Sequence, residues 1–268
     1  ARGFLLGATA GRTTLNGEGL QHEDGHSHLM SATIPNCVSY DPTFAYELAV
    51  IIQEGLRRMV QNQEDVYYYI TLMNENYSHP AMPKGSEEGI LKGMYNYSKS
   101  KAKGEKVQLM GSGVILREVI AAADLLEKDW GVSADVWSVP SFTELRREGL
   151  DCDRWNLLNP EKKQRISYVA ACLKDAKGPV IASTDYMKSF AEQIQRFVPN
   201  TFVALGTDGY GRSDSREALR DFFEVDRHYV VVAALKALSE EGKLPVAKVT
   251  EAIKKYKLNP NKPNPSLI

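Results

Sequence analysis

The chain has 268 residues, of which 43% are hydrophobic and 25% are charged, and its formal net charge is −1 at pH 7. This is ordinary globular composition with room for two domains, and it offers no global field that would attract nucleic acid or a membrane surface. No apolar run reaches the length of a membrane span. The three cysteines, Cys37, Cys152 and Cys172, lack a C-x-x-C spacing, which favours a reducing, cytoplasmic compartment over a disulfide framework.

The first third of the chain predicts strands around one loop. Residues 3–9 indicate a short strand, residues 10–28 a glycine-rich loop, and residues 31–42 a second short apolar run that ends at Pro42. The sequence has no initiator methionine and opens almost directly on a strand. We therefore expect it to begin inside a larger protein.

A helix is predicted to follow this run. Asp41 is the expected N-cap and Pro42 the expected first helical residue. Apolar side chains then recur at helical spacing, at Phe44, Leu48, Ile51, Ile52 and Leu56. Residues 66–72, "VYYYITL", are β-branched and aromatic and indicate a strand. This order of elements predicts part of a parallel α/β sheet.

A proline- and glycine-containing stretch, "MNENYSHPAMPKGSEEGI", predicts a linker with a domain boundary near residue 84, and so two domains, 1–83 and 84–268. Strands and helices alternate in the second domain. The strands are expected within 106–113, 134–142, 179–185 and 202–211, and the main helices within 114–131, 186–198, 226–242 and 245–256. Repeated strand-then-helix units favour a doubly wound, mostly parallel sheet.

The segment "GEGLQHEDGHSH", residues 17–28, holds three of the five histidines, His22, His26 and His28. With Asp24 they supply ligands suited to zinc. The letters "HEDGH" also match H-E-x-x-H, but that motif needs a helix and Gly25 lies inside it. A solvated polar loop and a substrate loop are the other interpretations, because ligands bind at loops that follow the strands of an α/β sheet.

Two glycine turns follow strands of the second domain. In "GSG" (111–113) the dinucleotide motif G-x-G-x-x-G fails at Leu116, so a structural turn is favoured over a nucleotide site. In "GTDGYGRSDSRE" (206–217) we expect Asp214 or Ser213 to cap a helix that starts near Ser215. The chain contains no G-x-S-x-G motif, so no serine nucleophile is singled out.

Several segments carry a family resemblance: "GRTTLNGEGLQHEDGHSH", "IPNCVSYDPTFAYELAVI", "VYYYITLMNENY", "SFTELRREGLDCDRWN", "ASTDYMKSFAEQI" and "GTDGYGRSDSRE". Together they resemble the E1 component of homodimeric bacterial pyruvate dehydrogenase complexes, which is a thiamine-diphosphate enzyme of the transketolase group. The resemblance implies that residues 1–83 end the family's middle, pyrimidine-binding domain. It also implies that residues 84–268 are a C-terminal transketolase-like domain.

The resemblance implies catalytic roles for three residues. The family's E-D-G-x-x-H segment, here residues 23–28, reaches the substrate side of the cofactor, and the preceding His22 resembles a residue that contacts the pyruvate-derived adduct. His22 is the first candidate, followed by His28 and Asp24. The family's magnesium motif and activating glutamate lie in upstream domains. We therefore expect no cofactor-binding or metal-binding residues here, and an inactive chain when it is isolated.

The implied reaction belongs to a longer parent protein. That parent would use thiamine diphosphate and Mg²⁺ to decarboxylate pyruvate and to acetylate the lipoyl group of E2, the dihydrolipoamide acetyltransferase, while forming a homodimer with a second E1 subunit. No nucleic acid or membrane partner is expected. The alternatives are a related enzyme for another 2-oxo acid, a non-catalytic assembly module, and a zinc hydrolase; "QHEDGHSH" in place of "EDGPTHQP" disfavours a sugar substrate.

Overall fold

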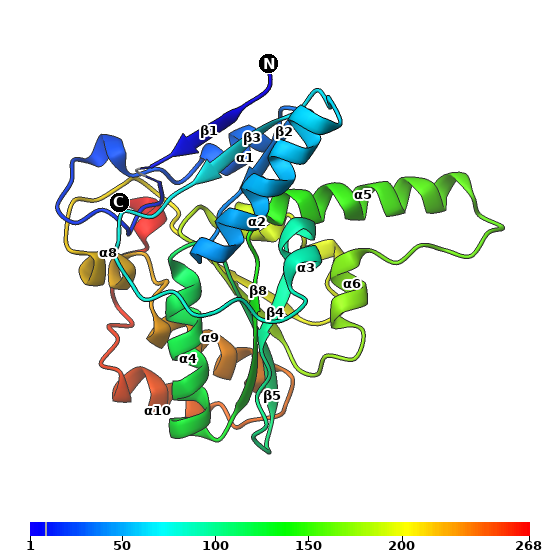
Figure 1. The fold of residues 1–268 in the computed structure, drawn as a ribbon. Helices are drawn as coiled ribbons and strands as arrows, with labels where there is room; N and C mark the ends of the chain where they lie inside the picture. The colour runs from blue at the N-terminus through cyan, green and yellow to red at the C-terminus, as the bar shows by residue number, and fades with distance from the viewer. Residues whose placement is uncertain (9) are drawn as a thin grey trace.

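The computed structural model describes residues 1–8 and 10–268, and it contains two sheets (Figure 1). The first sheet is parallel and has the strand order β1-β3-β2, with β1 at Phe4–Gly7, β2 at Cys37–Tyr40 and β3 at Tyr67–Thr71. Helix α1 (Ser27–Ala32) lies before β2, and α2 (Ala45–Leu56) with its π-helical extension Arg57–Gln61 lies between β2 and β3. The expected order of strand, loop, strand, helix and strand is confirmed.

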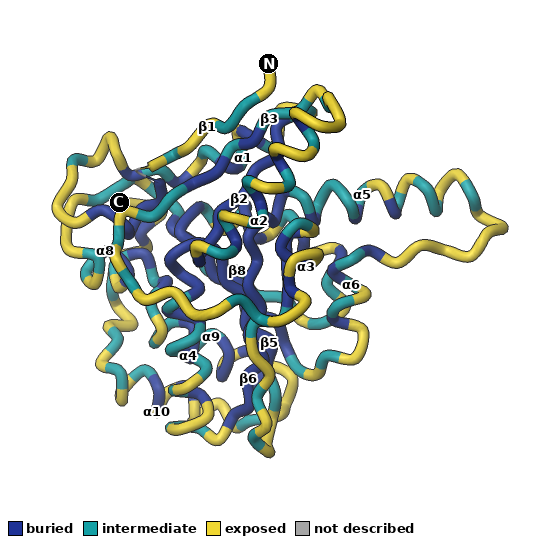
Figure 2. Tube along the Cα trace, in the orientation of Figure 1, coloured by how far each residue is buried: buried dark blue, intermediate teal, exposed yellow. Residues whose placement is uncertain are grey.

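The second sheet has the order β4-β6-β5-β7-β8. Its strands are β4 (Tyr95–Ser98), β5 (Lys106–Gly111), β6 (Ser133–Ser138), β7 (Val180–Ser183) and β8 (Phe202–Leu205). Only β4 runs antiparallel to its neighbour within the described residues, and the other pairs are parallel. The strands β5 and β6 are buried along almost their whole length (Figure 2), as expected for parallel strands covered on both faces.

Helices cover both faces of the second sheet, so the doubly wound prediction is confirmed. One face packs on α4 (Ile115–Trp130) and α9 (Arg227–Glu240), and the other on α5 (Phe142–Leu158), α6 (Tyr168–Leu173) and α7 (Lys188–Glu192). The remaining helices are α3 (Glu87–Lys92), α8 (Arg216–Phe222) and α10 (Ala247–Lys255). Gly131 ends α4 with a φ of 65°, a left-handed conformation that glycine adopts easily.

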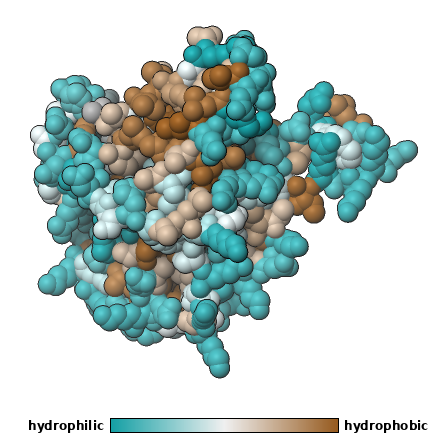
Figure 3. All heavy atoms as spheres, viewed as in Figure 1, coloured by the Kyte–Doolittle hydropathy of each residue, from teal (hydrophilic) through white to brown (hydrophobic). Residues whose placement is uncertain are grey.

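The surface is uneven around the two sheets. The free edge of β1 exposes Leu5 and Leu6, which are 58% and 50% accessible, and apolar residues gather over this strand (Figure 3). Helix α5 and the segment that follows it project away from the rest of the molecule (Figure 1), and Leu157 is exposed there. Within the described residues, no helix combines the length and apolarity needed to cross a membrane.

Two predicted helix caps are wrong. Helix α2 begins at Ala45 with Phe44 as N-cap, so Asp41 and Pro42 precede it. The reason is that Glu47, in the first turn, accepts the backbone N–H groups of Thr43 at 2.6 Å and Phe44 at 3.1 Å, while Asp41 is buried elsewhere.

The cap of α8 is also one or two residues later than expected. Ser215, rather than Asp214 or Ser213, is the N-cap, and its hydroxyl accepts the N–H of Ala218 at 3.3 Å. The Asp214 carboxylate instead accepts the N–H of Ser215 at 2.7 Å.

Candidate active site

The histidine-rich loop, residues 10–28, lies against the segments that follow β7 and β8. The N–H of Arg12 donates to the carbonyl of Asp185 at 3.3 Å, the N–H of Met187 to Gly25 at 3.1 Å, and the N–H of Gly17 to Asp214 at 2.9 Å. Doubly wound sheets bind their ligands at this carboxyl edge. In this chain the histidine-rich loop covers the carboxyl ends of β7 and β8, so the second sheet supports the loop.

His22 is the exposed candidate. It ends a short 3₁₀ turn, Leu20–His22, in which its N–H donates to Gly19 at 3.0 Å, and its side chain faces solvent. Since α1 starts only at Ser27, His22 and His26 do not share a helix, and the H-E-x-x-H geometry is absent from this loop. Within residues 1–8 and 10–268, no group of three or more histidine, cysteine or acidic side chains is placed to hold a metal ion.

Asp24 is half-buried and serves the local backbone. Its Oδ1 accepts the N–H groups of His26 and Ser27, each at 3.0 Å, and its Oδ2 accepts the hydroxyl of Ser27. These bonds satisfy N–H groups at the start of α1, where a helix has no internal acceptors for them. Asp24 therefore fixes the passage from the His22 turn into α1.

His28 is fully buried, in contrast to His22. Its ring stacks on Phe190 with centroids 4.8 Å apart and meets the edge of Tyr186 at 4.6 Å. Its Nε2 lies 2.9 Å from the hydroxyl oxygen of Thr71. Burial lowers the pKa of His28 to about 3, so its imidazole is neutral at physiological pH.

A chain of buried polar groups continues from Thr71 toward the second sheet. The Thr71 hydroxyl donates to Oδ1 of Asp41 at 2.7 Å, and the Ser112 hydroxyl donates to Oδ2 of the same carboxyl group at 2.9 Å. Burial raises the pKa of Asp41 to about 7. The "GSG" turn thus contacts a carboxyl group of this chain, and Gly113, with a φ of 50°, leaves room for that group.

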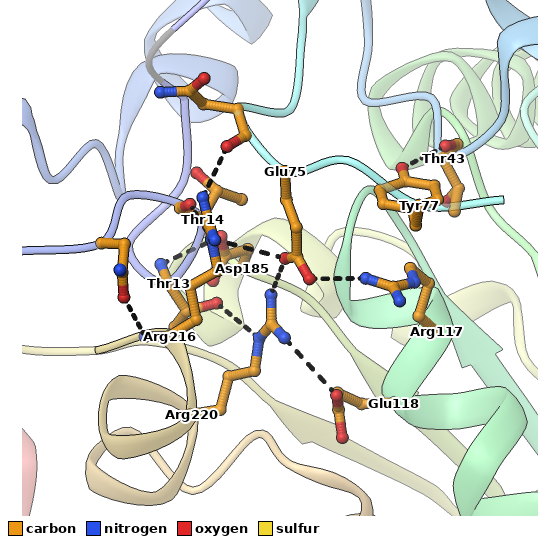
Figure 4. A network of polar contacts seen from close by, with 12 residues as sticks. Thr13, Thr14, Thr43, Glu75, Tyr77, Arg117, Glu118, Asp185, Arg216 and Arg220 are labelled. Carbon is orange, nitrogen blue, oxygen red and sulfur yellow. Dashed lines mark hydrogen bonds and ion pairs between the residues drawn. The ribbon is translucent and has the colours of Figure 1, made fainter.

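A second network joins the loop, the predicted linker and the helices α4 and α8 (Figure 4). Glu75 accepts from Arg117 of α4 at 2.6 Å and from Arg220 of α8 at 2.5 Å, and the Nε of Arg220 donates to the Thr13 hydroxyl at 3.3 Å. Arg216 donates to the backbone carbonyl of Thr14 at 2.5 Å. Helix α8 therefore holds the start of the histidine-rich loop.

Three buried charged residues between the loop and the second sheet were missed by sequence reasoning. Arg12 is 2% exposed, Glu23 7% and Asp185 1%. Burial, followed by the charge of Asp185, raises the pKa of Glu23 to about 8. The sequence placed Glu23 in the family's E-D-G-x-x-H segment, but nothing local marks its burial beside Asp185, which lies far along the chain.

Comparison with known proteins assigns the family. A profile of the pyruvate dehydrogenase E1 component middle domain matches residues 1–80, and a profile of the transketolase-like C-terminal domain matches residues 93–226. The chain belongs to the transketolase-like family of pyruvate dehydrogenase E1 components. The predicted resemblance is confirmed, whereas the boundary near residue 84 and the catalytic roles of His22, His28 and Asp24 stay predictions.

Named relatives agree along the whole chain. The E1 component of Cupriavidus necator is 67% identical over 99% of this chain, and that of Escherichia coli is 59% identical over 100% of it. This chain spans 30% of the length of each of these relatives. A transketolase variant from Pichia stipitis superposes on 89% of this chain and 30% of its own with a TM-score of 0.61 at 17% identity, which supports the fold.

Proposed function

We propose that this chain works as the C-terminal part of a longer pyruvate dehydrogenase E1 polypeptide, with residues 1–83 completing a middle domain and residues 84–268 forming the C-terminal domain. The parent decarboxylates pyruvate and acetylates the lipoyl group of E2 as a cytoplasmic homodimer. The supporting observation is that relatives named E1 component are 59% to 67% identical across essentially all of this chain, which spans 30% of their length.

His22 is the proposed catalytic residue of this chain. Its exposed imidazole lies on a 3₁₀ turn that packs on the segment after β8. The side chain is therefore accessible to a substrate while hydrogen bonds hold the backbone in place. A charged imidazole can hold the pyruvate carboxylate, and a neutral one can donate to the adduct oxygen. Asp24 and His28 belong to the same proposed site, where they fix the two ends of the segment that follows His22.

Thiamine diphosphate supplies the carbanion chemistry in this proposal. The cofactor and Mg²⁺ are proposed to bind residues outside this chain, which spans 30% of the length of the E1 relatives. The isolated chain is expected to show no turnover of pyruvate.

The test is His22→Ala in a full-length E1 polypeptide that carries this sequence. We expect kcat for pyruvate decarboxylation to fall by about 10² or more, in the range of lost general acid–base catalysis, while the Kd for thiamine diphosphate changes little. His228→Ala, which removes a partly exposed histidine on α9, is the control. An unchanged kcat in His22→Ala would remove His22 from the site, and turnover by the isolated chain would contradict the proposed division of the cofactor site.

A further inference from the structure

The carboxyl group of Glu23 is buried without a hydrogen-bond partner. Both of its oxygens lack a donor among the described residues, and Oδ1 of Asp185 and Nε of Arg12 also lack a partner there. All three residues are more than nine-tenths buried. An ionised carboxylate in such a place has a large desolvation cost, which a buried group avoids by holding its proton.

The surroundings decide which of the two carboxyl groups, Glu23 or Asp185, holds its proton to the higher pH. Asp185 receives the N–H of Thr13 on Oδ2 at 3.2 Å, and Arg12 and Arg220 lower its pKa, although burial outweighs them. Glu23 receives no such donor from the described residues, and the charges of Asp185 and Glu18 oppose its ionisation, while the charge of Arg12 favours it. The Arg12 guanidinium is shared with Asp208 and Asp24 as well. Burial raises the pKa of both carboxyl groups, and Glu23, which has the less favourable surroundings for a charge, holds its proton to the higher pH.

The position of Glu23 links its charge to His22. Glu23 directly follows His22 and is the C-cap of the 3₁₀ turn, with its N–H bonded to Leu20 at 3.1 Å. Its side chain packs so closely on Gly211, in the turn after β8, that a Cβ at Gly211 would overlap it. A charge on Glu23 would favour its exit toward water, and the His22 turn would move with it.

We propose that Glu23 is a positioning residue for His22: its buried, uncharged side chain packs the turn Leu20–His22 against the end of the second sheet, and ionisation of Glu23 releases that turn. This inference rests on the proposed function of His22. It assigns Glu23 no contact with the substrate. The release occurs as the pH rises through the raised pKa of Glu23, about 8.

The first experiment compares Glu23→Gln with the unaltered sequence in full-length E1 supplied with thiamine diphosphate, Mg²⁺ and pyruvate. For the unaltered enzyme we expect kcat to fall as the pH rises through about 8, by up to tenfold per pH unit, with a smaller change in KM. Glutamine has the same shape and cannot ionise, so the fall should be absent in the variant. Glu240→Gln, on an exposed face of α9, is the control. An alkaline fall that persists in Glu23→Gln overturns the proposal.

The second experiment needs no turnover and uses this chain alone. The infrared difference spectrum between the unaltered chain and Glu23→Gln should contain a protonated carboxyl band at pH 7 that disappears as the pH rises through about 8. Absence of that band from the difference spectrum overturns the proposal, because the difference isolates Glu23 from the other buried carboxyl groups, Asp41 and Asp185. A full-length enzyme without pyruvate turnover would instead contradict the proposed function and leave the infrared result to decide the state of Glu23.

Discussion

Two buried glutamates, Glu47 and Glu23, have opposite surroundings. Glu47, in the first turn of α2, is fully buried, and its carboxyl group accepts from the Tyr95 and Ser138 hydroxyls at 2.7 and 2.5 Å and from two backbone N–H groups. Glu23, in the histidine-rich loop, is almost as buried and accepts from none of the described residues. The same side chain is thus fully bonded in one place and unpaired in the other.

This difference separates a carboxyl group that holds the fold together through its hydrogen bonds from one whose burial no hydrogen bond among the described residues explains. A buried carboxyl group with several donors stabilises the fold, because removing it leaves those donors without a partner. An unpaired buried carboxyl group contributes little bonding, and natural proteins keep such groups mainly at functional sites. Glu23 adjoins the proposed catalytic histidine, whereas Glu47 joins α2 to the second sheet.

A large loss of stability is expected when Glu75 loses one of its arginine partners. Arg220→Ala removes a guanidinium that is 9% exposed and that pairs with Glu75 at 2.5 Å. We expect the free energy of unfolding to fall by about 3 kcal/mol, the lower part of the range for breaking a buried ion pair, because Arg117 remains beside Glu75. Urea unfolding of this chain measures it.

The matched control for this change is Arg196→Ala. Arg196 pairs with Asp153 at 2.7 Å, but both side chains are exposed, so a loss within about 1 kcal/mol is expected. Equal losses for the two variants would show that the Glu75–Arg220 pair is no more important than a surface contact.

A direct comparison of the two glutamates uses leucine, which keeps most of the volume and removes both oxygens. Glu47→Leu leaves the buried N–H groups of Thr43 and Phe44 without their acceptor, and about 1–3 kcal/mol is lost for each such group. Glu23→Leu removes no bonded group, so its loss at pH 7 should stay below about 1 kcal/mol. Chemical denaturation of both variants at one pH decides between them, and a larger loss for Glu23→Leu would reverse the assignment of roles.

The sequence predicted well what depends on neighbouring residues. The aromatic and β-branched run at 66–72 predicted β3, and the alternation after the linker predicted the doubly wound sheet. The family was predicted from short motifs such as "QHEDGHSH", which need no knowledge of distant contacts. The exposure of His22 agrees with its expected loop setting.

What depends on distant residues was not predicted. Asp41 precedes a proline and so has the local pattern of an N-cap. Its side chain is instead buried and accepts a hydrogen bond from Ser112, which lies 71 positions away. The Glu75–Arg220 pair joins residues 145 positions apart. The unpaired state of Glu23 depends on how its loop packs on the segments that contain Asp185 and Gly211, so the residue spacing within the loop does not predict it.

The smallest loss of stability is expected for Asp41→Asn, because the Asp41 carboxyl group bonds to hydroxyl groups that can reorient. In Asp41→Asn the amide nitrogen would donate to the Ser112 oxygen. The Ser112 hydroxyl would then donate to the Thr184 oxygen, which lies 3.1 Å away. The loss of unfolding free energy at pH 7 should therefore stay below about 1 kcal/mol.

The pH dependence of this variant tests the charge of Asp41. Burial raises the pKa of Asp41 from 3.8 to about 7, so between these values the folded chain holds a proton that the unfolded chain has released. The contribution of Asp41 to stability therefore declines as the pH rises from about 4 to about 7. The introduced asparagine cannot ionise, so Asp41→Asn should gain stability relative to the unaltered chain across that range, as measured by unfolding at each pH. A loss of several kcal/mol that stays constant over the range would mean that Asp41 carries a charge that the fold requires.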